Sequence, residues 1–148
     1  LERAGLTATL RSMLEAVSRS TEIDIVSCID GIDGLVPRER EIDLYRIVQE
    51  CMNNILKHSA ATAADVTIRN SDGTIVVRIQ DNGAGFHAAE RNVRHVGETG
   101  LGMQSMTERV RMLGGELRVE SEPGRGTTVT TRIPITRVMA VEQRERAE

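Results

Sequence analysis

Two stretches in the middle of the chain, 63–69 and 75–80, alternate apolar with polar residues. The turn-forming residues Ser71, Asp72 and Gly73 lie between them. A period of two puts one set of side chains on each face of a strand, and Asp-Gly between two such runs is a strong hairpin signal. The sequence therefore predicts a pair of strands with one buried face.

Helical spacing of apolar residues, at intervals of three and four, marks three further segments: 6–17, about 37–58 and 101–113. Pro37 suits the first turn of its helix, and Gly114 with Gly115 ends the last one. Each helix can bury one face only. The helices are therefore expected to cover a sheet.

Three more strands are predicted at 23–29, 116–121 and 127–135, the last two joined by a turn at 122–126. Strands gathered into one mixed sheet with helices on a single face give an α+β fold, a two-layer α/β sandwich. We divide the chain into an N-terminal helix and strand at 1–36, a main domain at 37–136 and a polar tail at 137–148.

The composition narrows the function. The 148 residues carry a net charge of −3 with both signs interspersed, so we expect no direct nucleic-acid binding. One Tyr, one Phe and no Trp leave aliphatic side chains to line any pocket for a nucleotide base.

Cys28 and Cys51 lack metal-type spacing, which favours packing roles in a reducing compartment. The chain begins at Leu1, which favours an excised piece of a longer protein.

Four polar residues follow one another at helical spacing near the end of the middle helix: Glu50, Asn54, Lys57 and His58. The Asn54 amide oxygen could ligate Mg²⁺, which takes one or two protein oxygens together with substrate phosphates. Glu50 could orient a metal-bound water, and the two basic residues could contact phosphate oxygens. The structural alternative is a solvated face with cations at a helix C-terminus.

Asp81 ends a predicted strand and is followed by Gly83 and Gly85. A carboxylate there can accept a hydrogen bond from the exocyclic amine of adenine, where guanine presents an oxygen. Glycines let the backbone approach the base, although Asp-Asn-Gly also forms ordinary turns. The following segment, 86–99, lacks a clean period and predicts a long mobile loop that could act as a lid.

Gly100, Leu101 and Gly102 open the next helix, where free N–H groups and the helix dipole favour phosphate. A flexible hinge is the alternative for these glycines. The chain contains neither Gly-x-x-x-x-Gly-Lys-Ser/Thr nor a strand-bound Gly-x-Gly-x-x-Gly, so P-loop and Rossmann sites lose support.

Taken together, these motifs resemble the catalytic, ATP-binding domain of two-component sensor histidine kinases, in the superfamily shared with DNA gyrase, the heat-shock chaperone ATPases and the mismatch-repair MutL proteins. The resemblance covers about 40–135. Segment 49–58 is similar to the N box, and 81–86 and 100–103 are similar to the two glycine boxes. The motifs at 57–60 and 100–109 look most like the nitrate-sensor type of kinase.

The resemblance implies the Bergerat ATP-binding fold, with ATP and Mg²⁺ as cofactors and transfer of the γ-phosphoryl group to a histidine. It implies these roles by position: Asn54 ligates Mg²⁺ and Glu50 assists through water, Lys57 and His58 touch phosphates, Asp81 binds the adenine amine, Gly83 and Gly85 shape the base pocket, Thr127 joins a water network beside Asp81, and Gly100, Leu101 and Gly102 close over the phosphates.

The family's phosphoacceptor histidine lies upstream on a dimerising helical hairpin, and no His precedes Lys57 here. His58 belongs to the N box, and His87 and His95 fall in the predicted loop, so none is a credible acceptor. The resemblance implies two partners, a separate dimerisation and phosphoacceptor domain and a response regulator with a LuxR-type DNA-binding domain. It also implies a cytoplasmic domain and leaves open whether the parent protein is anchored in a membrane.

Two alternatives share the fold. An anti-sigma-factor-like serine kinase or partner-switching module would need no upstream histidine hairpin, but Lys57 with His58 and the 103–109 run argue against it. A nucleotide-free scaffold is disfavoured because Asn54, Asp81 and the glycines are all present.

Overall fold

The computed structural model describes residues 5–86 and 103–135. Along the chain the helices and strands are α1 (Gly5–Ser20), β1 (Asp24–Ile29), the 3₁₀ helix η1 (Arg38–Arg40), α2 (Glu41–Asn54), the π-helical turn η2 (Ile55–Ser59), β2 (Ala63–Ser71), β3 (Thr74–Asp81), α4 (Met103–Met112), β4 (Glu116–Ser121) and β5 (Thr127–Pro134).

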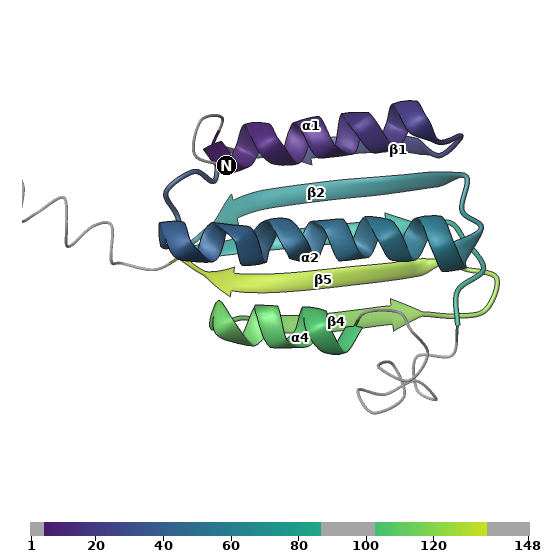
Figure 1. Cartoon of the computed structure of the whole chain (residues 1–148). Helices are drawn as coiled ribbons and strands as arrows, with labels where there is room; N and C mark the ends of the chain where they lie inside the picture. The colour runs from purple at the N-terminus through teal and green to yellow at the C-terminus, as the bar shows by residue number, and fades with distance from the viewer. Residues whose placement is uncertain (1–4, 87–102, 136–148) are drawn as a thin grey trace, which may run out of the picture.

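The five strands form one sheet in the order β1-β2-β3-β5-β4. β1 runs parallel to β2, and the other neighbouring pairs are antiparallel. Helices α1, α2 and α4 lie side by side over one face of this sheet (Figure 1). The mixed sheet and single helical layer confirm the predicted two-layer α+β sandwich.

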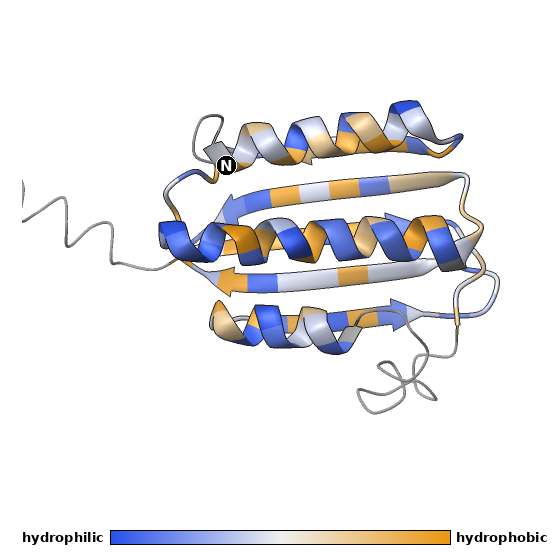
Figure 2. Ribbon diagram, viewed as in Figure 1, coloured by the Kyte–Doolittle hydropathy of each residue, from blue (hydrophilic) through white to orange (hydrophobic). Residues whose placement is uncertain are grey.

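The core fills the space between the two layers. It is built from aliphatic side chains, because alternate residues of the strands face the helices and each helix turns an apolar stripe inward. Figure 2 shows hydrophobic residues separated by more polar ones along β2. The fully buried members include Leu6, Leu10, Leu44, Ile47, Ile68, Ile75, Met106 and Ile133. The N-terminal helix thus belongs to the same core as the central helix.

The β2–β3 hairpin has the turn that its sequence predicts. Asp72 and Gly73 both adopt positive φ, 47° and 79°, as a two-residue turn between twisted strands requires. The helix predicted at 37–58 is present but changes type along its length, from 3₁₀ through α to π. The predicted strand at 116–121 has the observed bounds of β4.

The two cysteines have different surroundings. Cys51 is buried in the core, as predicted, whereas Cys28 is exposed, so the packing role predicted for Cys28 is wrong. Strand β1 carries apolar residues at both parities, and Val26, two residues before Cys28, is also exposed on the uncovered face of the sheet. Among the residues placed here, no helix combines the length and apolar character needed to cross a bilayer.

Candidate functional site

A cavity opens at one end of the helical layer, beside the C-terminal end of α2. It encloses about 530 Å³ of empty space, counting the part open to solvent. The lining comes from three parts of the chain that lie far apart in the sequence: Cys51, Asn54, Ile55 and Ser59 from α2 and η2, Ile79, Asp81, Gly85 and Phe86 from β3 and the turn that follows it, and Thr127 and Val129 from β5.

Asp81 supplies the carboxylate of this cavity. As the last residue of β3 it stands in register with Ala64 on one side and Thr127 on the other, and it is only 7% exposed. Burial raises the pKa of Asp81, while hydrogen bonds from the backbone N–H groups of Gly83 and Thr127 oppose that rise. The Gly83 nitrogen lies 2.8 Å from Oδ1, which leaves further lone pairs of the carboxylate for a ligand.

The turn after β3 is fixed by backbone hydrogen bonds to two other segments. The Ala84 N–H donates to the Ser59 carbonyl at 2.5 Å, and the Ala84 carbonyl accepts from the Gly124 N–H at 2.6 Å. A Cβ on Gly83 would overlap the Ser59 carbonyl, and one on Gly85 would overlap the Glu122 carbonyl. Close approach of three backbones therefore requires glycine at both positions.

The end of the central helix forms another wall. Asn54 is the last residue of α2, and the π-helical turn that follows ends at Ala60, which adopts a left-handed conformation with φ of 54°. The Ser59 hydroxyl donates to the Ile55 carbonyl at 2.7 Å and accepts from the Ala61 N–H at 3.1 Å. π turns inside helices are frequent at functional sites.

The remaining walls are apolar. Ile55, Ile79, Val129 and Phe86 line the cavity, so the predicted aliphatic lining also includes one aromatic residue. Cys51 lies among them with its Sγ 3.8 Å from the Met106 Sδ. Burial raises the pKa of the Cys51 thiol to about 12, which keeps it neutral at physiological pH.

The cavity brings together four of the residues predicted from the sequence: Asn54, Asp81, Gly85 and Thr127. Gly83 lies immediately beside them, through its hydrogen bond to Asp81. The half-buried Glu50 and the exposed Lys57 are not among the lining residues. The side chain of His58, Gly100, Leu101 and Gly102, and residues 87–99 of the predicted loop lie outside the described residues.

Two serines of this site, Ser59 and Ser121, were assigned no role from the sequence. Ser59 contributes both its hydroxyl and its carbonyl, and Ser121 on β4 binds the turn after β3 through its hydroxyl, 2.8 Å from the Phe86 nitrogen. Ser59 lies in the 57–60 motif, directly after Lys57 and His58, but nothing in that motif indicates its contacts, and Ser121 stands in no motif. A signal was available for Ser121, because β4 otherwise alternates apolar with charged residues and Ser121 occupies an inward position.

An acceptor carboxylate at a strand end, apolar walls, glycine turns and a polar helix end are features that suit a flat heterocycle with a polar edge. A helix-covered mixed sheet with this site is an ATP-binding sandwich. Residues 39–137 match the family described as Histidine kinase-, DNA gyrase B-, and HSP90-like ATPase, and the chain belongs to that family.

Curated relatives narrow the class. The chain is 35% identical over 136 residues to the signal transduction histidine-protein kinase/phosphatase DegS of Brevibacillus brevis, an alignment that covers 92% of the chain and 34% of DegS. It is 31% identical over 134 residues to the sensor histidine kinase MctS of Rhizobium johnstonii, covering 90% of the chain and 28% of MctS. The chain thus spans about a third of these relatives.

Among solved structures, the histidine kinase domain of the Erythrobacter litoralis EL346 blue-light activated histidine kinase is similar, with a TM-score of 0.72 and 26% identity. The match covers 93% of this chain and 64% of that one. The chain is accordingly an ATP-binding domain of the kind found in sensor histidine kinases, and its relatives favour that class over the serine-kinase alternative.

Proposed function

We propose that this domain binds Mg-ATP and positions the γ-phosphoryl group for transfer to a histidine on a separate dimerisation domain, within a two-component signalling protein. The cavity carries the proposal, because it joins the amide of Asn54 to the carboxylate of Asp81 across apolar walls. Phosphoryl transfer asks a protein chiefly for positioning and charge neutralisation. A cavity at the junction of three parts of the chain suits the first of these.

The base would lie at the inner end. Asp81 accepts from the exocyclic amine of adenine, Gly83 and Gly85 keep the turn narrow beside the ring, and Thr127 joins a water network next to the carboxylate. Apolar walls stabilise the ring through burial. Guanine would set an oxygen against the same carboxylate, so selectivity for adenine follows from charge repulsion and a lost hydrogen bond.

The phosphates would lie toward the helix end. In this arrangement Lys57 and His58 contact phosphate oxygens, and Gly100, Leu101 and Gly102 close over them at the start of α4. Glu50, one helical turn before Asn54, orients a water. Backbone N–H groups at a helix start favour phosphate, which supports the assignment of the second glycine motif.

Mg²⁺ would be held by Asn54 together with the phosphates. In the part of the chain that the structure covers, no group of three or more His, Cys, Asp or Glu side chains could hold a metal ion. A single amide oxygen suits Mg²⁺, which keeps several waters and enters kinase sites with the nucleotide. When bound, the ion supplies neutralisation of phosphate charge.

The matched family segment supports 37–136 as the ATPase module. We assign 1–36 to an N-terminal addition that completes the sheet and leads toward the dimerisation and phosphoacceptor domain, and 137–148 to a tail. The relatives are named sensor histidine kinases or a histidine kinase/phosphatase, which supports a response regulator as partner. The nitrate-sensor type of motif favours a regulator with a LuxR-type DNA-binding domain.

Calorimetric titration of the 148-residue chain with ATP, GTP and a non-hydrolysable ATP analogue, each with and without Mg²⁺, tests the proposal. We expect binding that prefers adenine and responds to Mg²⁺. Asp81→Asn should weaken ATP strongly, whereas Asn54→Asp should mainly alter the Mg²⁺ dependence. Unchanged ATP affinity in the Asp81 variant would refute the adenine assignment, and absence of any nucleotide binding would refute the function of this chain on its own.

A further inference from the structure

One hydroxyl connects three segments around the cavity. Ser121 ends β4 on the inner face of the sheet, 9% exposed and in register with Thr127, which is itself in register with Asp81. Its Oγ lies 2.8 Å from the Phe86 nitrogen, 3.1 Å from the Gly126 carbonyl oxygen and 2.8 Å from Oγ1 of Thr127. Ser121 is therefore the neighbour of a cavity-lining hydroxyl, without lining the cavity itself.

The number of protons and lone pairs on the Ser121 hydroxyl limits which of its neighbours can donate to it. A serine hydroxyl has one proton to donate and two lone pairs to accept with. The Phe86 N–H takes one lone pair, and the proton goes to the carbonyl of the buried Gly126, because a buried carbonyl left without a donor costs free energy. Only an acceptor position then remains for the Thr127 hydroxyl.

We propose that Ser121 fixes the direction of the Thr127 hydroxyl, so that Thr127 donates to Ser121 and presents only lone pairs to the cavity. Beside the acceptor Asp81, this makes the polar end of the site an acceptor-only edge. This role rests on the proposed function. Ser121 is then a positioning residue that determines specificity for a base with an exocyclic amine. It acts on the ligand by direct contact of the Thr127 hydroxyl with the exocyclic group at C6 of the base.

The test compares dissociation constants for ATP and inosine triphosphate, whose base carries a carbonyl at C6 and a proton on N1 where adenine carries the amine and a lone pair. In Ser121→Ala the Thr127 proton is released to turn toward that carbonyl, and we expect the preference for ATP to fall about tenfold, the scale of one exchanged hydrogen bond. Thr131→Val is the matched control, because Thr131 is a fully buried hydroxyl on β5 outside the cavity. Its preference should not change.

Thr127→Val tests the direction of the Thr127 hydroxyl independently, so the inference can be checked even if Ser121→Ala does not fold. An acceptor-only Thr127 predicts that ATP loses more affinity than inosine triphosphate. Equal losses for the two nucleotides in either variant, or a larger loss for inosine triphosphate in Thr127→Val, would overturn the inference while leaving ATP binding intact. Failure of the unaltered chain to bind ATP would instead overturn the proposed function, and the inference with it.

Discussion

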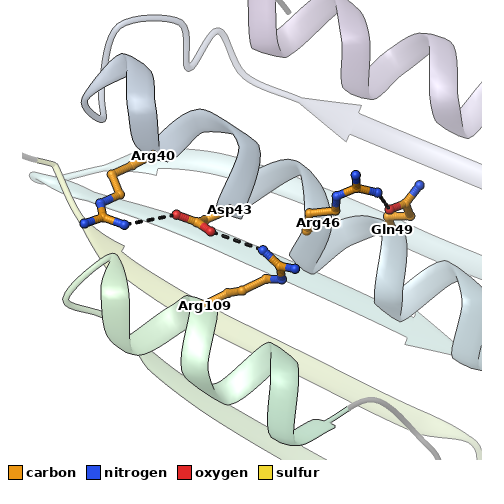
Figure 3. Close-up of polar contacts among 5 residues, drawn as sticks. All are labelled: Arg40, Asp43, Arg46, Gln49 and Arg109. Carbon is orange, nitrogen blue, oxygen red and sulfur yellow. Dashed lines mark hydrogen bonds and ion pairs between the residues drawn. The ribbon is translucent and has the colours of Figure 1, made fainter.

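The Nη1 atom of Arg109 on α4 lies 3.2 Å from Oδ1 of Asp43 on α2, so an ion pair joins α4 to the helix whose C-terminal end lines the cavity (Figure 3). Arg40 approaches the other oxygen of Asp43 at 3.5 Å. The Asp43 side chain is only 9% exposed, and Arg109 is 32% exposed. The carboxylate is therefore shielded from water and depends on these two guanidinium groups.

Loss of the inter-helix pair should destabilise the fold. Arg109→Met removes the closer partner of a nearly buried carboxylate, and we expect the free energy of unfolding to fall by about 1–3 kcal/mol. Arg40→Met removes a more exposed and longer contact, with an expected effect below about 1 kcal/mol. Urea denaturation measures both. Equal effects of the two substitutions would contradict the dominance of the α2–α4 pair.

The raised pKa of Asp81 predicts a pH-dependent stability. Because this pKa is higher in the folded chain, the folded chain keeps the proton at pH values where the unfolded chain has released it. The free energy of unfolding therefore falls as pH rises from the ordinary carboxyl range through the raised pKa. Asp81→Asn lacks this loss, so its stability relative to the unaltered chain should rise with pH.

Urea denaturation of both proteins between about pH 4 and pH 7 provides the measurement for Asp81. A relative stability of the variant that falls with pH would mean that the N–H groups of Gly83 and Thr127 outweigh the cost of burial. Nucleotide affinity measured on the same samples separates the effect of Asp81 on stability from its role in binding. The Asp81→Asn variant should gain relative stability as pH rises, while its affinity for ATP should be lower than that of the unaltered chain.

Gly83 should not tolerate a methyl group. In Gly83→Ala the new Cβ would overlap the Ser59 carbonyl, and overpacking of this kind costs about 1–3 kcal/mol. We expect lower stability and weaker ATP binding, because the turn that carries the cavity must shift. Gly31→Ala is the control, with open space around its Cβ and an expected change within about 0.5 kcal/mol. Comparable ATP affinities in both variants would contradict the steric argument.

The two thiols should differ in reactivity. Cys28 is exposed, whereas Cys51 is buried and its pKa is raised to about 12. Since the thiolate is the reactive form, an aromatic disulfide reagent should titrate one thiol in the folded chain and two in denaturant. Cys28→Ser should leave none reactive in the folded state. Rapid modification of Cys51 without denaturant would show that the cavity opens more widely than its walls suggest.

Local patterns predicted the secondary structure well, because the periodicity of apolar residues and the presence of turn-forming residues depend only on residues that are close in the sequence. The alternation around Asp72 and Gly73 gave the β2–β3 hairpin, and the inward residues of β4 gave that strand its observed bounds. Cys28 was placed wrongly because a strand with apolar residues at both parities does not reveal which face is covered.

The site was predicted where its residues form compact motifs and missed where they depend on register. Asp81 and Asn54, which the structure brings to the cavity, were proposed from a glycine turn and a helical spacing, and their roles remain predictions. Ser59 and Ser121 were not proposed, because their partners lie 25 and 35 positions away, in a turn bonded to the Ser59 carbonyl and to the Ser121 hydroxyl. Contacts of this length are fixed only once helix end, hairpin and β4–β5 turn have assembled.

The cavity is made of three parts of the chain that meet only when it is folded. A nucleotide that touches all of them would act as a reversible crosslink with little affinity for the unfolded chain. By mass action, ATP at a hundredfold excess over its dissociation constant would add about 2.7 kcal/mol to the free energy of unfolding. The lifetime of this domain and the supply of ATP around it would then be thermodynamically linked, quite apart from any phosphate that it transfers.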